Sequence, residues 1–146
     1  MIVLDTTVLL YAVGTEHRFR DPCRRVVERV AQGRLAATTT AEVIQEFAHV
    51  RARRRSREDA ARLATDYLDL LQPLLSPSEE DVRGGLALWR RSGRLGAFDA
   101  VLAEGARTAR ADALISADAA FGDVSGLRHV VPTQEAVDAL LVAHGS

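Results

Sequence analysis

Short apolar runs alternate with amphipathic helical segments along the whole chain. Residues 2–4, 35–38, 113–116 and 129–131 have the length and composition of buried strands. The segments between them carry apolar residues at helical spacing and are bounded by Asp, Ser, Thr, Gly or Pro. This alternation predicts an α/β fold with a mostly parallel central sheet, because a helix between two strands lets both run in the same direction. We find no repeat, linker or low-complexity tract and expect residues 1–146 to form one domain.

Capping residues and apolar stripes predict where the main helices begin and end. Asp21 as N-cap and Pro22 as first helical residue start a helix that Gly33 closes. Further helices are expected over residues 40–53, from Ser56 to Pro73, from Ser78 to Gly93, over 99–110 and from Thr133 onward. Gly84 and Gly85 weaken the middle of the helix that begins at Ser78.

The composition excludes several classes of protein. The 146-residue chain is 47% hydrophobic and 27% charged, as is usual for folded globular domains. No apolar run approaches the roughly 20 residues that a membrane span needs. The chain starts without a basic leader and has one cysteine, Cys23, at an apolar helical position, so we expect a cytoplasmic protein. All 19 basic residues are arginine, which excludes a catalytic lysine, and the net charge of −1 gives no overall attraction to nucleic acid.

Two aspartates follow expected strands. Asp5 ends the run at residues 2–4, and Asp118 comes two residues after Ser116. In parallel α/β sheets, ligands bind at the edge formed by the carboxyl ends of the strands. Each aspartate also has a structural explanation that the sequence leaves open. Asp5 could cap the following helix, and Asp118 could be a turn residue.

Two further carboxylates lie on expected helices near their apolar faces. Glu46 lies about 40–60° from the apolar positions Val43 and Val50, whereas Glu42 lies about 100° from Val43. A carboxylate beside a buried stripe needs a cation or hydrogen-bond donors, and an arginine partner is the structural alternative. Asp99 shares a helical face with the apolar residues three, four and seven positions on, unless it is the N-cap of that helix.

Taken together, the four acids indicate a metal site. Carboxylates gathered at one edge of a sheet repel one another strongly unless they are protonated or bridged by divalent cations. A ligand set of carboxylate oxygens suits Mg²⁺ or Mn²⁺ rather than Zn²⁺, and no Cys or His is spaced for zinc. Such a centre is suited to phosphodiester hydrolysis, because a bound cation acidifies water and a second one stabilises the leaving oxygen.

The four segments that contain these acids match the motifs of a known family. They are residues 2–9 (IVLDTTVL), 40–47 (TAEVIQEF), 96–103 (GAFDAVLA) and 113–121 (ALISADAAF). In order and spacing the chain resembles the PIN-domain ribonucleases, specifically the VapC-type toxins of prokaryotic toxin–antitoxin pairs. The resemblance covers nearly the whole chain and implies a three-layer α/β/α fold around the parallel sheet.

The resemblance also implies roles for individual residues. It assigns the catalytic metal cluster of the family, which would hold Mg²⁺ or Mn²⁺, to Asp5, Glu46, Asp99 and Asp118. Ser116, with its hydroxyl group, and Thr6 would support the cluster by orienting a ligand or a water. Two positions depart from the family pattern: Thr7 stands where Ser or Asn is frequent, and Ala120 stands where a further Asp is common. The second departure would weaken an outer metal position.

The implied activity is that of a metal-dependent endoribonuclease acting as the toxin of a type II toxin–antitoxin system. Members of the family usually dimerise, and the antitoxin usually lays a chain segment across the acidic groove. The resemblance therefore implies a VapB-like antitoxin and a second copy of the chain as partners, beside the RNA substrate.

The sequence itself offers a few candidates for contact with RNA or another subunit. Arginines crowd residues 51–57 and 90–94, where they could bind RNA phosphates or form a solvated face. Trp89 is expected in the core or at a subunit interface. Aromatic residues make up only 5% of the chain, which does not favour a base-stacking platform.

Two other functions compete with this interpretation. A phosphoacceptor similar to haloacid dehalogenases or receiver domains would use Asp5 as a covalent nucleophile, but both normally need a lysine, and this chain has none. A non-catalytic RNA-binding or protein-interaction module on the same fold would bind without metal, although the presence of all four acids does not indicate lost catalysis. The spacing leaves open whether Glu42 assists or replaces Glu46.

Overall fold

The computed structural model describes residues 1–145 and shows an α/β fold; Ser146, the last residue of the predicted domain, lies outside the described residues. Within residues 1–145, four parallel strands form one sheet in the order β2-β1-β3-β4. They are β1 (Ile2–Leu4), β2 (Ala37–Thr38), β3 (Ala113–Ile115) and β4 (His129–Val130). The predicted parallel sheet is therefore confirmed, and the carboxyl ends of the paired central strands β1 and β3 lie side by side.

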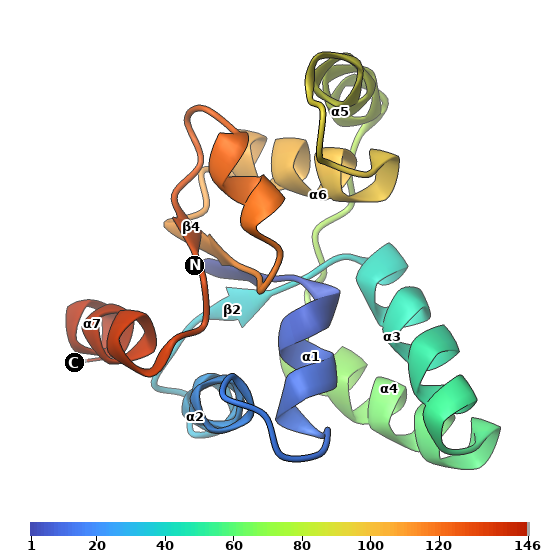
Figure 1. Ribbon diagram of the computed structural model, residues 1–146, viewed down its shortest axis with the longest axis vertical. Helices are drawn as coiled ribbons and strands as arrows, with labels where there is room; N and C mark the ends of the chain where they lie inside the picture. Colours follow the sequence, from blue (N-terminus) through green and yellow to red (C-terminus); the bar gives the residue numbers. More distant parts are fainter. Residues whose placement is uncertain (146) are drawn as a thin grey trace.

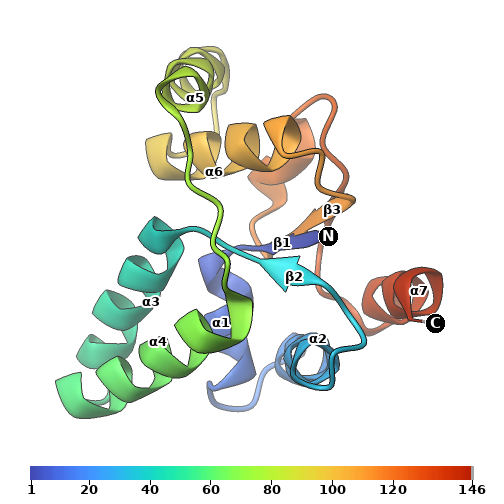
Figure 2. The same ribbon diagram turned by 180° about the vertical axis from the view of Figure 1, so that it is seen from behind.

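Helices cover both faces of this sheet. They are α1 (Thr6–Ala12), α2 (Arg20–Ala31), α3 (Ala41–Arg54), α4 (Arg57–Leu71), α5 (Glu79–Arg91), α6 (Ala97–Thr108) and α7 (Gln134–His144), with a short 3-10 helix, η1 (Ala119–Asp123). In Figures 1 and 2 the strands run between α6 on one side and α1 and α2 on the other, which confirms the three layers. α3 packs against α4, and α5 packs on α6. Within residues 1–145, no helix has the length and apolar character needed to cross a membrane.

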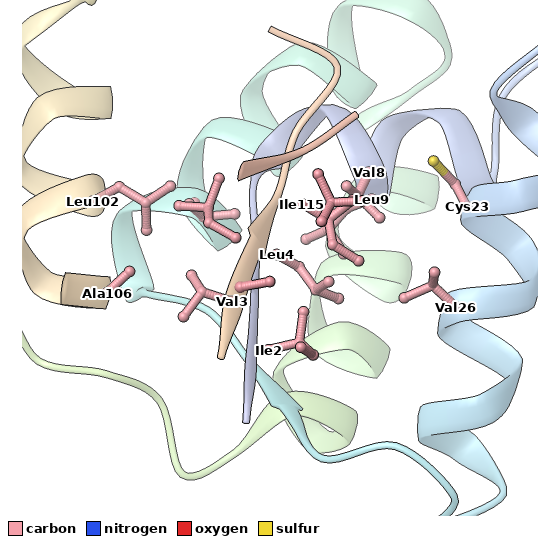
Figure 3. Packing of buried hydrophobic residues seen from close by; sticks show 14 of the residues in the cluster. Ile2, Val3, Leu4, Val8, Leu9, Cys23, Val26, Leu102, Ala106 and Ile115 are labelled. Carbon is pink, nitrogen blue, oxygen red and sulfur yellow. The ribbon is translucent and has the colours of Figure 1, made fainter. Parts of the chain in front are cut away.

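The central strands are buried on both faces, which explains why they are apolar throughout. All of β1 is fully buried. Figure 3 shows Val3 on the side of Ala106 of α6. Ile2 and Leu4 lie on the other side, toward Val26 of α2. A parallel strand between two helical layers needs an apolar side chain at every position, so a continuous run replaces the alternating pattern of a half-exposed strand.

Local capping explains where most helices begin. The N-caps lie where the sequence predicts helices to begin, and each accepts a hydrogen bond from the backbone N–H three residues on: Thr40, Ser56, Ser78 and Thr133. Ser78 and Asp81 also form a reciprocal capping box.

The predicted starts of two helices and one strand are wrong. α2 begins at Arg20 rather than after Asp21, because a turn at residues 17–19 leads into it: the Phe19 N–H donates to the ring of His17. α6 begins two residues before Asp99. In the expected strand at residues 35–38, only the last two residues pair with β1.

The sequence offers both Cys23 and Trp89 as candidates for the hydrophobic core. Cys23 is fully buried, and burial raises the pKa of its thiol to about 12, so it is protonated at neutral pH. Trp89 is 47% exposed, so its placement in the core is wrong. Its place at a subunit interface stays a prediction.

Gly84 and Gly85 lie where α5 approaches α6. A Cβ atom on Gly85 would stand 2.7 Å from the Cα of Val101, which is backbone of α6. A Cβ atom on Gly84 would stand 2.6 Å from Oε1 of Glu104. The close packing of α5 on α6 therefore explains why two glycines stand in the middle of α5. The sequence alone indicated only that these glycines weaken the helix.

We expect Gly85→Ala to lower the free energy of unfolding by about 1–3 kcal/mol, since the new methyl group would meet backbone that cannot move aside. This cost exceeds the gain of about 1 kcal/mol in helix propensity. Gly93→Ala is the control, because a Cβ there would meet nothing within 4 Å. Urea unfolding of both variants measures the difference, and a Gly85→Ala variant as stable as the wild type would contradict the packing.

Candidate metal centre

Two hydroxyl groups hold the carboxylate of Asp5. This residue follows β1 directly and is 4% exposed. Ser116, which follows β3, donates to Oδ2 of Asp5 at 2.6 Å, and Thr7 donates to the same oxygen at 3.0 Å. Asp5 occupies the N-cap position of α1, but its side chain makes no capping hydrogen bond. Capping therefore does not explain this buried carboxylate, whose orientation is set by side chains from β3 and α1.

The same two hydroxyl groups connect Asp5 to the segment that carries Asp118. The hydroxyl oxygen of Ser116 accepts from the Asp118 N–H at 3.0 Å, and that of Thr7 accepts from the Ala117 N–H at 3.0 Å. Oδ1 of Asp118 accepts from the Ala120 N–H at 2.9 Å, which confirms the predicted turn role and leaves Oδ2 for another partner. Thr7 was not expected to support the centre, because its bond with the Ala117 N–H joins residues that are 110 positions apart along the chain.

Glu46 reaches the same region from α3. Thr6 donates from its hydroxyl group to Oε2 of Glu46 at 2.8 Å and so links α3 to the residue that follows Asp5. Thr6 is a hydrogen-bond donor of the kind expected for Glu46, but Glu46 is exposed, whereas Val43 and Phe47 make the buried face of α3. Within residues 1–145, Glu46 has no arginine partner, so an ion pair does not explain its position.

Asp99 lies among the other three carboxylates. It is the third residue of α6, and Gly96 occupies the N-cap, so the capping alternative for Asp99 is wrong. Partial burial, and after it the negative charges of Asp5, Glu46 and Asp118, raise the pKa of its carboxyl to about 7. The fold thus brings all four predicted acids into one electrostatic neighbourhood.

The donor set fits a hard divalent cation, although the side chains are not closed around one. In the part of the chain that the structure describes, no three His, Cys, Asp or Glu side chains stand close enough to hold a metal ion. Repulsion between carboxylates acts over longer distances than coordination, which explains why the acids interact without touching. The four side chains offer only oxygen ligands, which Mg²⁺ and Mn²⁺ prefer. A bound divalent cation would also favour the ionised form of the Asp99 carboxyl, whose pKa is raised.

An apolar groove of about 630 Å³ opens beside the acids. Glu46 and Asp99 line it together with side chains of α3, α5 and α6. Phe98, the neighbour of Asp99, also lines it and is 79% exposed. Glu42 lines the groove as well but makes no hydrogen bond to another described side chain, which distinguishes it from Glu46.

Comparison with known protein sequences places the chain among ribonucleases. A family model described as PIN domain matches residues 2–127. The chain is 54% identical to Ribonuclease VapC7 of Mycobacterium tuberculosis over 142 residues, which are 97% of this chain and 98% of that protein. It is 35% identical to Ribonuclease VapC23 of the same species over 101 residues, which are 68% of this chain and 78% of that protein.

Solved structures share the fold at lower identity. A toxin–antitoxin complex from Klebsiella pneumoniae contains a chain that superposes with a TM-score of 0.66 at 19% identity, covering 90% of this chain and 98% of that one. VapBC2 from Rickettsia felis, bound to a DNA fragment from its promoter, superposes with a TM-score of 0.67 at 18% identity, covering 88% and 97%.

Proposed function

This chain belongs to the PIN-domain family and, within it, to the VapC ribonucleases, and on that basis we propose how its catalytic centre is built. Asp5, Glu46, Asp99 and Asp118 hold a divalent cation, Mg²⁺ or alternatively Mn²⁺, at which RNA phosphodiesters are hydrolysed. The observation that carries the proposal is the carboxyl of Asp99, whose pKa is raised to about 7 by burial and then by the three other acids. A divalent cation is the natural partner for such a cluster, and the family as a whole depends on divalent metal ions.

Neighbouring hydrogen-bond donors orient three of the four carboxylates, and the carboxylates supply the negative charge. Ser116 and Thr7 both donate to Oδ2 of Asp5, and neither donates to its other oxygen, Oδ1. Thr6 likewise occupies one oxygen of Glu46, and the Ala120 N–H occupies one oxygen of Asp118. Each of these three carboxylates is held through one oxygen and keeps the other for a ligand.

When bound, a divalent cation supplies positive charge that makes a water easier to deprotonate and offsets charge building up on the phosphate. The protein contributes fixed acceptors, so that little rearrangement is needed when substrate arrives. With a cation bound, Asp99 would be held as the carboxylate, since a positive charge beside it would offset the effect of its negative neighbours.

We further propose the setting in which this ribonuclease works. It acts as the toxin of a type II pair and is held inactive by a VapB-like antitoxin, in keeping with the toxin–antitoxin complexes that share its fold. We also propose that residues 1–146 form one domain, that the chain forms a homodimer, and that it acts in the cytoplasm.

Cleavage of purified total RNA tests the activity. We expect discrete cuts with Mg²⁺ or Mn²⁺, loss of cutting in EDTA and recovery when metal is added back. RNA binding without cleavage at any metal concentration would instead support a non-catalytic module on this fold. Cleavage that persists in EDTA would contradict the metal-dependent centre.

The hydroxyl of Ser116 gives a prediction of its own. We expect Ser116→Ala to lower the cleavage rate about 10- to 100-fold, because residues that orient metal ligands contribute effects of this size. Thr7→Ser keeps the second hydroxyl group and is the control that should stay near the wild-type rate. Initial rates over a Mn²⁺ series measure both variants, and equal rates for Ser116→Ala and Thr7→Ser would contradict the role of Ser116.

A further inference from the structure

The solvent face of α3 begins at the metal centre and continues beyond it. Glu42, Gln45, Glu46 and His49 are exposed on this face and line the groove. Arg53 comes four residues after His49 and seven after Glu46, so it lies on the same face, one turn beyond His49. In Figure 1 this helix runs from its beginning near α6 to a far end beside α4.

The charge along this face changes sign. Its first half carries Glu42 and Glu46, which repel the phosphates of RNA. Its far end carries Arg53, which is exposed and takes part in none of the ion pairs formed by residues 1–145. Arg51, two residues earlier, is engaged differently: it donates to the carboxylate of Asp59 and to the Val13 carbonyl. Arg53 is therefore available to a ligand, whereas Arg51 holds α3 to its neighbours.

We propose that Arg53 binds a backbone phosphate of the RNA a few nucleotides from the bond that is cut, and that the strand follows the solvent face of α3. This inference rests on the proposed ribonuclease function and adds a substrate contact to it. Seven residues of helix rise by about 10 Å, which is close to three stacked nucleotides at about 3.4 Å each. The chain carries a net charge of −1, so affinity for a polyanion must come from local cations such as this one.

Arg54 is a matched control for Arg53. It is also exposed and also forms no ion pair within residues 1–145. Its position continues the row of Phe47 and Val43, which are buried, so it lies on a different face of α3. Replacing either arginine removes one charge from the same turn of the same helix. Only the direction of the side chain differs.

The test is binding of a fluorescein-labelled single-stranded RNA of random sequence by Asp99→Asn protein, in which cleavage cannot interfere. A random sequence is suitable because phosphate contacts carry no sequence information. We expect Arg53→Gln to raise the Kd about tenfold, and Arg54→Gln by less than about twofold. The slope of log Kd against log salt should fall by about 0.7 for Arg53→Gln only. Arg53→Lys should recover most of the affinity because it keeps the charge.

Other outcomes would overturn the inference without touching the proposed function. Equal effects of the two substitutions would mean that only the net charge of this turn matters. An unchanged Kd for Arg53→Gln, or an unchanged slope of log Kd against log salt, would mean that Arg53 does not contact the RNA. The proposed function has its own readout, metal-dependent cleavage by the wild type, so its failure would be seen separately.

Discussion

Replacing Asp99 by asparagine is expected to reduce RNA cleavage more than about a hundredfold, since even residues that only support a metal ligand cost about 10- to 100-fold. The pKa of Asp99 is raised by its burial and then by the negative charges of all three other carboxylates. Asparagine keeps the size of the side chain and removes its charge. Initial rates on total RNA, with Mg²⁺ or Mn²⁺ present, measure the loss.

The same substitution should stabilise the metal-free protein, which separates lost chemistry from lost folding. The proton of Asp99 leaves at about pH 7 in the folded chain and near the ordinary 3.8 in the unfolded chain. Between these values the folded state binds more protons, so wild-type stability falls as the pH rises. Asp99→Asn lacks this dependence. In EDTA, urea unfolding should therefore show that the free energy of unfolding of the variant increases relative to that of the wild type from about pH 4 to pH 7.

An Asp99→Asn protein that cleaves RNA at the wild-type rate would contradict the catalytic assignment. A variant that is inactive and also unfolded would not test the chemistry, which is why the unfolding curves belong to the same experiment. A stability difference that does not change with pH would contradict the raised pKa of Asp99.

Glu46→Gln and Glu42→Gln should differ strongly, although both side chains lie on α3 and both line the groove. We expect Glu46→Gln to lower cleavage more than about a hundredfold and Glu42→Gln less than about threefold. The reason is that Thr6, the residue after Asp5, donates to Glu46 at 2.8 Å, whereas Glu42 has no such link.

The pair of variants is its own control, because each removes one charge from the same helix. Rates at saturating Mn²⁺, together with the metal concentration needed for half activity, distinguish a lost ligand from a weakened fold. If only Glu42→Gln abolishes cleavage, the assignment of Glu46 is wrong and Glu42 replaces it.

The sheet and its acidic edge were predictable because their signals are local. The apolar run at residues 2–4 and the one ending at Ser116 indicate buried strands on their own, and the rules for parallel sheets place their ends together. The helix starts at Thr40, Ser78 and Thr133 were predictable for the same reason, since a cap needs only partners within a few residues.

The features that sequence reasoning missed depend on partners far along the chain. Thr7 links Asp5 to the Ala117 N–H, and the second of these partners lies 110 residues away along the chain. Gly85 is required by the backbone of α6, which periodicity within α5 cannot reveal. Glu46 is exposed although it lies only about 40–60° from Val43, because the angle around a helix does not show how far the buried face extends.

The central claim is that the four carboxylates form one divalent-metal centre. Crystals of the wild-type protein grown with Mn²⁺ test it directly through the anomalous scattering of the ion. We expect an anomalous peak between the carboxylates of Asp5 and Asp99, within reach of Glu46 or Asp118, and no such peak in Asp99→Asn crystals. A protein that cleaves RNA with Mn²⁺ but binds the ion elsewhere, or binds it equally well in Asp99→Asn, would contradict the centre described here.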